Sequence, residues 1–152
     1  MNEGILNGRG HADPAHTTLW SAGLRAAAFS AVVNAGVVAL AVMAGVFPQL
    51  HVLPFAGSGF GLGSVVLISA AAALGGTALY SLLWQRAERP MHVFALLVSS
   101  ALLVSFAAPM FVEGWTPSRL GVMELTHLVV AGVTVAALWR WTRSETHSPG
   151  AD

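Results

Sequence analysis

The sequence has no cysteine and no lysine, and only 9% of its 152 residues carry a charge. The absence of cysteine excludes disulfides, thiolate metal sites and cysteine nucleophiles. Soluble domains carry about 25% charged residues, so this chain has too little charge to cover a water-facing surface. The formal net charge is zero, which leaves no basic footprint for binding nucleic acid. Both aspartates, Asp13 and Asp152, lie near the chain ends, so no Ser–His–Asp constellation can be argued.

Four long apolar segments take the place of the missing charge. Hydrophobic residues make up 55% of the chain, and the mean hydropathy is +0.69. The segments cover residues 26–47, 63–84, 91–112 and 120–139. Because a helix rises about 1.5 Å per residue, about 20 apolar residues cross the roughly 30 Å hydrocarbon core of a bilayer. Short loops make neighbouring helices antiparallel, so we predict an all-α integral membrane protein with an up-down-up-down four-helix bundle.

The charged and aromatic residues around these segments predict a single membrane domain and its orientation. We assign residues 20–141 to the membrane domain, and residues 1–19 and 142–152 to flexible tails. Six of the seven arginines flank one side of the predicted bundle, and Arg119 alone lies on the other. Positive charge concentrates in cytoplasmic loops, so we expect a multi-pass cell-membrane protein with both termini in the cytoplasm. Trp115 falls at the outer interface, and the other four tryptophans fall at the inner one.

Stripes of small side chains predict where the first two helices touch. Membrane helices associate through close packing and interhelical hydrogen bonds, since lipid tails are as apolar as leucine. The expected contact on the first helix comprises Ala27, Ser30, Ala31, Asn34, Ala41 and Gly45, and on the second Ser69, Ala73, Gly76 and Tyr80. We also expect Tyr80 and Trp84 to anchor the second helix at the membrane interface.

A few polar residues within the apolar segments are the candidates for chemistry, because ionisable groups in a membrane are costly. Glu124 and His127 are three residues apart and share a helix face, about 6 Å and about 10 Å inward from Leu120. Glu113 ends the third segment on the same side. We predict a polar pocket in the outer half of the bundle, with the candidate residues Asn34, Ser105, Pro109, Met110, Glu113, Glu124 and His127.

Pro109 is expected to bend the third helix and so to open space near these residues. Proline removes one backbone hydrogen bond and bends a helix. Ser105, four residues earlier, can satisfy the carbonyl that is freed. The resulting kink would open room near the outer leaflet.

The polar residues allow several interpretations. The first is a structural hydrogen-bond network, with neutral His127 bonded to Asn34 or Ser105. The second is a binding or transport pocket with a proton-coupled Glu124–His127 pair. The third is a metal or redox site, because Glu124 and His127 match one Glu-x-x-His step of di-iron bundles. Those bundles use two such steps and two further glutamates, so no metal site is predicted, and no specific motif indicates a cofactor.

The third and fourth segments carry a family resemblance. The run from Leu102 to Pro109 and the run from Leu125 to Ala131 resemble an uncharacterised family of small four-helix membrane proteins found in actinobacteria and haloarchaea. The resemblance covers roughly residues 20–140 and implies the same four-helix membrane fold, with no known activity to carry over. It implies that the family's marked positions are Asn34, Ser105, Pro109 and His127, and it does not include Glu113 or Glu124.

These observations favour a non-enzymatic membrane protein that binds a partner or an apolar ligand through the pocket. The alternative is an oligomeric small-molecule or proton-coupled transporter. Four helices enclose little volume, so transport would need a homo-oligomer. The third reading is a membrane-embedded enzyme that uses Glu124 and His127. The lipid bilayer is an expected partner in all three readings.

Overall fold

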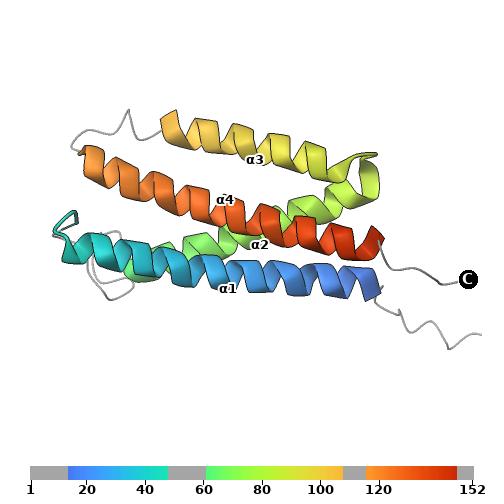
Figure 1. Ribbon diagram of the computed structural model, residues 1–152, viewed down its shortest axis with the longest axis horizontal. Helices are drawn as coiled ribbons and strands as arrows, with labels where there is room; N and C mark the ends of the chain where they lie inside the picture. The colour runs from blue at the N-terminus through green and yellow to red at the C-terminus, as the bar shows by residue number, and fades with distance from the viewer. Residues whose placement is uncertain (1–13, 48–60, 108–115, 147–152) are drawn as a thin grey trace, which may run out of the picture.

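Four helices make up most of what the structure describes, which is residues 14–47, 61–107 and 116–146 of this computed structural model. The helices are α1 (Pro14–Met43), α2 (Leu62–Arg86), α3 (Pro90–Ala107) and α4 (Pro117–Thr146). Successive helices run in opposite directions, so the start of α1 and the end of α4 lie at the same end of the molecule (Figure 1). The predicted all-α, up-down-up-down four-helix bundle is confirmed.

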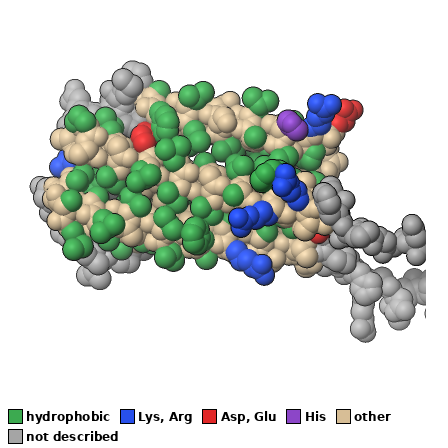
Figure 2. All heavy atoms as spheres, in the orientation of Figure 1, with side chains coloured by type: hydrophobic (Ala, Val, Ile, Leu, Met, Phe, Trp, Pro, Cys, Tyr) green, Lys and Arg blue, Asp and Glu red, His purple; other side chains and the backbone are tan. Residues whose placement is uncertain are grey.

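The two ends of the bundle differ in charge. We call the end where α1 and α3 begin the Arg-rich end, because Arg86, Arg89, Arg140 and Arg143 all lie there. Arg119 lies at the opposite end, near the start of α4, and its Nε donates to the backbone carbonyl of Val46 over 3.0 Å. Figure 2 shows the arginine side chains gathered over the Arg-rich end.

All four helices are long and apolar enough to cross a membrane. The crossing segments are Thr17–Met43, Leu62–Arg86, Pro90–Ala107 and Pro117–Glu145, with mean hydropathies of 2.1, 1.9, 1.9 and 1.7. Large apolar side chains point outward from the bundle, and hydrophobic side chains are spread over the face seen in Figure 2. Lipid tails can cover such a surface at no cost, whereas water cannot. The chain is therefore an integral, multi-pass membrane protein.

Local signals fix several helix ends. Three helices begin on a proline, at Pro14, Pro90 and Pro117. Proline suits a first helical turn because its missing N–H would have no partner there. α1 ends in a Schellman turn, in which Gly45 has a φ of +74° and the N–H of Val46 donates to the carbonyl of Ala41 over 2.9 Å.

Two helices are longer than the apolar pattern predicted. α1 begins at Pro14 and α4 continues to Thr146, so both helices reach into the segments 1–19 and 142–152 that the sequence assigned to tails. The remaining part of the third predicted crossing segment, residues 108–112, lies outside the described residues.

Polar contacts between the ends of α1 and α4 account for the extra turns. Trp141 Nε1 donates a hydrogen bond to Thr18 Oγ1 over 2.9 Å. Thr18 Oγ1 in turn donates to Glu145 Oε1 over 3.3 Å. The apolar pattern does not register such polar pairs, so it began α1 too late and ended α4 too early.

Small side chains let α1 and α2 pack closely, as the stripes predicted. The buried members are Ala27, Ser30, Ala31, Asn34 and Ala41 on α1, and Ser69 and Ala73 on α2. A close contact also lies outside the predicted stripe, because a Cβ added to Gly23 would lie 2.5 Å from the side chain of Thr77. Two assignments were wrong: Gly45 is exposed, and the neighbours of Gly76 are Thr134 and Phe94 rather than α1.

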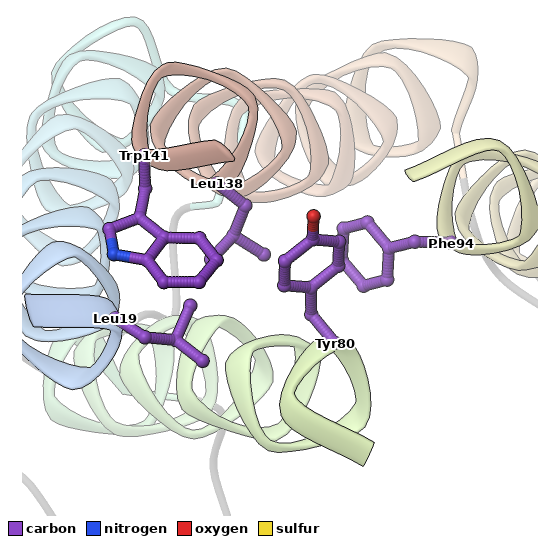
Figure 3. Packing of buried hydrophobic residues seen from close by; sticks show 5 residues of the cluster. All are labelled: Leu19, Tyr80, Phe94, Leu138 and Trp141. Atoms are coloured by element: carbon purple, nitrogen blue, oxygen red, sulfur yellow. The ribbon is translucent and has the colours of Figure 1, made fainter. Parts of the chain in front are cut away.

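An aromatic cluster joins all four helices near the Arg-rich end. It comprises Leu19, Tyr80, Phe94, Leu138 and Trp141 (Figure 3). The Tyr80 ring meets Phe94 edge-on, with centroids 5.3 Å apart, and meets Trp141 edge-on at 6.2 Å. Such T-shaped contacts are the favoured geometry for aromatic pairs.

Tyr80 is therefore not the interfacial anchor that the sequence suggested. Its side chain is fully buried, and its hydroxyl lies 2.6 Å from Thr142 Oγ1 of α4. The partner hydroxyl allows the ring to enter the packed interior, because the phenol is then not left without a hydrogen bond. Trp84, also predicted as an anchor, stays partly exposed and packs against Trp141 with centroids 5.0 Å apart.

α3 is the least enclosed of the four helices. Phe94, in its first turns, is its one buried residue among those that the structure describes. Farther along, Leu96 and Leu103 are 69% and 71% exposed. α3 is thus held at its beginning by the aromatic cluster and packs less closely after it, which leaves room between α3 and its neighbours.

Candidate functional site

A cavity of about 430 Å³ occupies that room, between α2, α3 and α4. α1 adds Asn34 and Val38 to its wall. On α2, α3 and α4 the lining residues run from Val65 to Gly76, from Phe94 to Ser105 and from Met123 to Thr134. Each stretch corresponds to about 16 Å of helix at about 1.5 Å per residue. The cavity therefore extends well past the level of Asn34 toward the Arg-rich end, farther than the outer-half pocket that the sequence predicted.

The cavity wall is apolar and uncharged. Half of the lining residues are alanine, valine, leucine or isoleucine, and no Asp, Glu or Arg is among those that the structure describes. The polar lining residues are Asn34, Ser69, Ser105, Thr126, His127 and Thr134. A wall of this kind suits a molecule with an apolar body and a small neutral polar group, since a charge would lose its hydration without compensation.

The cavity opens through the side of the bundle. Ile68, Ala72, Ala101 and His127 line it while also being exposed on the molecular surface. Figure 2 shows the surface hollowed between α3 and the helices below it. Phe94 belongs to the aromatic cluster, so packed side chains close the cavity toward the Arg-rich end. In a membrane, the side opening faces lipid rather than water.

Asn34 forms the polar centre of the cavity wall. Its Nδ2 donates to Ser69 Oγ over 2.9 Å and to the backbone carbonyl of Thr126 over 3.0 Å. A carbonyl only accepts, so the contact with Thr126 fixes which end of the amide is the NH₂ group. The other end, Oδ1, is buried and has no hydrogen-bond partner among the described residues.

His127 is bonded to its own helix. Its Nδ1 lies 2.9 Å from the backbone carbonyl of Met123. Since the carbonyl must accept, Nδ1 carries the proton, and in the neutral form of the ring Nε2 is then an acceptor. The sequence-based interpretation expected a bond to Asn34 or Ser105, whereas the described contact of the His127 ring is with the carbonyl of Met123.

Two further buried hydroxyls lack partners in the described part of the chain. Thr134 Oγ1 belongs to the cavity wall, and Ser30 Oγ lies on α1 one turn before Asn34, outside the lining. Buried polar groups are normally paired, so an unpaired one calls for an explanation. The orphaned oxygens of Asn34 and Thr134 belong to lining residues, whereas the orphaned oxygen of Ser30 does not.

Glu124 stands apart from the cavity. Both of its carboxylate oxygens are buried without a hydrogen-bond partner, and the residue is not part of the lining. No hydrogen bond joins it to His127 among the interactions of the described helices. The two residues are three positions apart on α4, yet His127 lines the cavity and Glu124 does not.

The predicted pocket residues therefore divide into three groups. Asn34, Ser105 and His127 lie together in one cavity wall. Glu124 is placed elsewhere. Pro109, Met110 and Glu113 lie outside the described residues. The expected kink at Pro109 and the place of Glu113 in the pocket therefore stay predictions.

Several residues that line the cavity were not predicted from the sequence. Thr126 and Thr134 are eight residues apart on α4, with Val130 between them, and all three line the cavity. That spacing places them on one helix face. The two threonines could have marked this face of α4 in the sequence. They were not singled out because threonine is common in membrane helices.

The described residues contain no group of three or more His, Asp or Glu close enough to hold a metal ion. Near the cavity, His127 is the one side chain of a metal-ligating type in the described lining. A single imidazole with neutral amide and hydroxyl neighbours is a set of hydrogen-bonding groups rather than a metal-ligand set. The site is thus suited to neutral ligand recognition.

Comparison with known proteins places the chain in a family without adding an activity. No curated protein and no solved structure matches it. Residues 14–144 match a family of unknown function, DUF6069. This range includes all four described helices except the last two residues of α4. The chain belongs to that family, DUF6069.

Proposed function

We propose that this protein is a non-enzymatic membrane protein that binds an apolar small molecule in the cavity between α2, α3 and α4. The observation that carries the proposal is an uncharged cavity of about 430 Å³ whose opening faces the lipid. Ligand pockets of about 300–1,000 Å³ with mostly apolar walls and a few polar groups are typical of small-molecule sites. A lipid-soluble ligand would reach the site from the bilayer without crossing water.

The arrangement of the polar residues supports binding over the two alternatives. A proton-coupled transporter or a membrane enzyme built on Glu124 and His127 needs both side chains at one place. His127 lines the cavity, whereas Glu124 is absent from the lining. A homo-oligomer, which transport through so small a bundle would need, stays a prediction from the sequence.

We further propose that the protein lies in the cell membrane with the Arg-rich end and both termini in the cytoplasm. The described arginines support this orientation, since Arg119 is the one at the opposite end in the described part of the chain. Positive residues in short loops are retained on the cytoplasmic side. The occurrence of the family in actinobacteria and haloarchaea, which the resemblance implied, likewise stays a prediction.

Native mass spectrometry of the detergent-purified protein tests the binding proposal. We expect a non-covalent adduct of constant mass on the wild-type chain. Ala131→Phe fills the cavity from α4 and should abolish the adduct. Ala136→Phe is the matched control, because Ala136 is exposed on the same helix and does not line the cavity.

The comparison of these two variants decides the result. An adduct lost in Ala131→Phe and kept in Ala136→Phe locates the ligand in the cavity. An adduct that survives Ala131→Phe belongs to the outer surface and contradicts the proposal, as does a wild-type chain that carries no adduct and takes up none from added lipid extract.

A further inference from the structure

The hydrogen-bonding groups of the cavity specify more than an apolar ligand. His127 Nδ1 is committed to the carbonyl of Met123, so Nε2 of the neutral ring can only accept. The Asn34 amide is oriented by the carbonyl of Thr126, so its unpaired Oδ1 can also only accept. Two residues of one cavity wall thus present acceptors that no described donor satisfies.

The hydroxyls nearby do not resolve this surplus of acceptors. Ser69 Oγ already accepts from Asn34, and Thr126 Oγ1 donates to the carbonyl of Met123 over 2.7 Å. Thr134 Oγ1 is buried without a partner, and an unpaired hydroxyl can either donate or accept. Among the described contacts none of these hydroxyls donates to His127 Nε2, so a donor from a ligand can pair with it.

We propose, building on the proposed function, that the ligand is a membrane-soluble molecule with a neutral hydroxyl group, an apolar alcohol or phenol, which donates its proton to His127 Nε2. His127 is the first contact because it is exposed at the cavity, whereas Asn34 Oδ1 is buried. A carboxylate or an ammonium group is excluded by the uncharged wall. A ketone, quinone or ether has no proton to donate to His127 Nε2.

The geometry also gives the ligand an orientation. His127 and Ser105 lie toward the end of the cavity away from the Arg-rich end, and Phe94 closes the other end. The hydroxyl group would lie beside His127, with the apolar body extending toward Phe94 along the helix from His127 to Thr134, about 10 Å. Aliphatic residues such as Val98 and Val130 line that path.

Two methionines make the proposal measurable. Met123 lines the cavity, whereas Met43 is 84% exposed on α1 and reports contact with lipid. The full chain, labelled with ¹³C at the methionine methyl groups and placed in lipid nanodiscs, would be titrated with 1-dodecanol and with its isomer methyl undecyl ether. The two probes have the same atoms and differ in whether the oxygen can donate.

The expected result is a saturable shift of the Met123 methyl signal, with half-saturation at a roughly three- to tenfold lower mole fraction for the alcohol, the factor that one hydrogen bond supplies. Met43 should respond weakly and equally to both probes. His127→Leu should remove the preference for the alcohol. Ser30→Ala is the matched control, because it deletes an unpaired buried hydroxyl outside the lining and should keep the preference.

The outcomes separate this inference from the proposal on which it rests. If both probes shift Met123 at the same mole fraction, the cavity binds apolar molecules but the hydroxyl assignment is overturned. If the preference for the alcohol survives His127→Leu, His127 is not the acceptor and the assignment is also overturned. If neither probe shifts Met123 beyond the response of Met43, the proposed function itself fails.

Discussion

Asn34 and Ser69 face each other across α1 and α2, with the amide nitrogen 2.9 Å from the hydroxyl oxygen. The same nitrogen lies 3.0 Å from the carbonyl oxygen of Thr126 on α4, so one buried amide connects three helices. Inside a bilayer an unpaired amide finds no water to replace these partners. Asn34 therefore sets how α1, α2 and α4 align beside the cavity.

The first prediction concerns the strength of that connection. Asn34→Leu should lower the free energy of unfolding by about 1–2 kcal/mol, because two interhelical hydrogen bonds are lost and each contributes about 0.6 kcal/mol on average and at most about 1.7. Ser69→Ala removes one of the two and should cost about half as much. Reversible unfolding in mixed micelles measures both, and a larger loss for Ser69→Ala than for Asn34→Leu would contradict the assignment.

The second prediction concerns the close contact between Gly23 of α1 and Thr77 of α2. Gly23→Ala should destabilise the protein by about 1–3 kcal/mol, because the added Cβ would lie 2.5 Å from the Thr77 side chain and force the helices apart. Gly75→Ala is the control, since no atom lies within 4 Å of a Cβ placed there. It should be neutral or slightly stabilising, as alanine favours the helix over glycine.

A double variant checks the cause of that effect. Thr77→Ala removes the two nearest atoms that the new Cβ would meet, Cγ2 and Oγ1, and keeps the Thr77 Cβ at 2.9 Å. Gly23→Ala should therefore cost less in its presence than alone. Residues in direct contact show this kind of non-additivity. Additive costs, measured by the same unfolding assay, would show that the two residues do not meet.

The third prediction separates Glu124 from His127. Glu124→Leu should raise the free energy of unfolding by about 1–3 kcal/mol, because it removes buried carboxylate oxygens that have no partner in the described structure. His127→Ala should change stability by under about 1 kcal/mol, since the imidazole is exposed and bonded within its own helix. Both variants should accumulate in the membrane like the wild type. Destabilisation by Glu124→Leu would reveal a partner for the carboxylate.

The fourth prediction tests orientation, and the absence of cysteine makes the experiment clean. Glu88→Cys, in the turn between α2 and α3 at the Arg-rich end, should resist a membrane-impermeant maleimide in intact cells and react after lysis. Ser118→Cys, exposed at the start of α4 at the opposite end, should react in intact cells. The reverse pattern of labelling would invert the proposed topology.

The helices were largely predictable because the bilayer imposes a length. Each apolar segment that the sequence marked corresponds to one helix of the structure, and Pro90 and Pro117 begin helices where a proline is favoured. The start of α1 and the end of α4 were missed because polar pairs between the two helices extend them. Trp141 with Thr18 is such a pair, between residues distant in sequence.

The candidate site was predictable only in part. Asn34, Ser105 and His127 could be singled out because polar groups are rare and costly in membrane helices. Helical spacing placed Glu124 beside His127, but spacing does not say which neighbouring helix each side chain meets. Tyr80 was read as an anchor because a sequence cannot show that Thr142 lies 2.6 Å from its hydroxyl.

By itself, the sequence determined that this chain is a four-helix membrane protein, since hydrophobicity and segment length act residue by residue along the chain. The tertiary structure decided where the cavity lies, which of its polar atoms are satisfied and which end of the Asn34 amide donates. The physical reason is that packing and hydrogen bonding depend on distances between helices. α3 packs closely at Phe94 and loosely beyond it, and that difference arises from all four helices together.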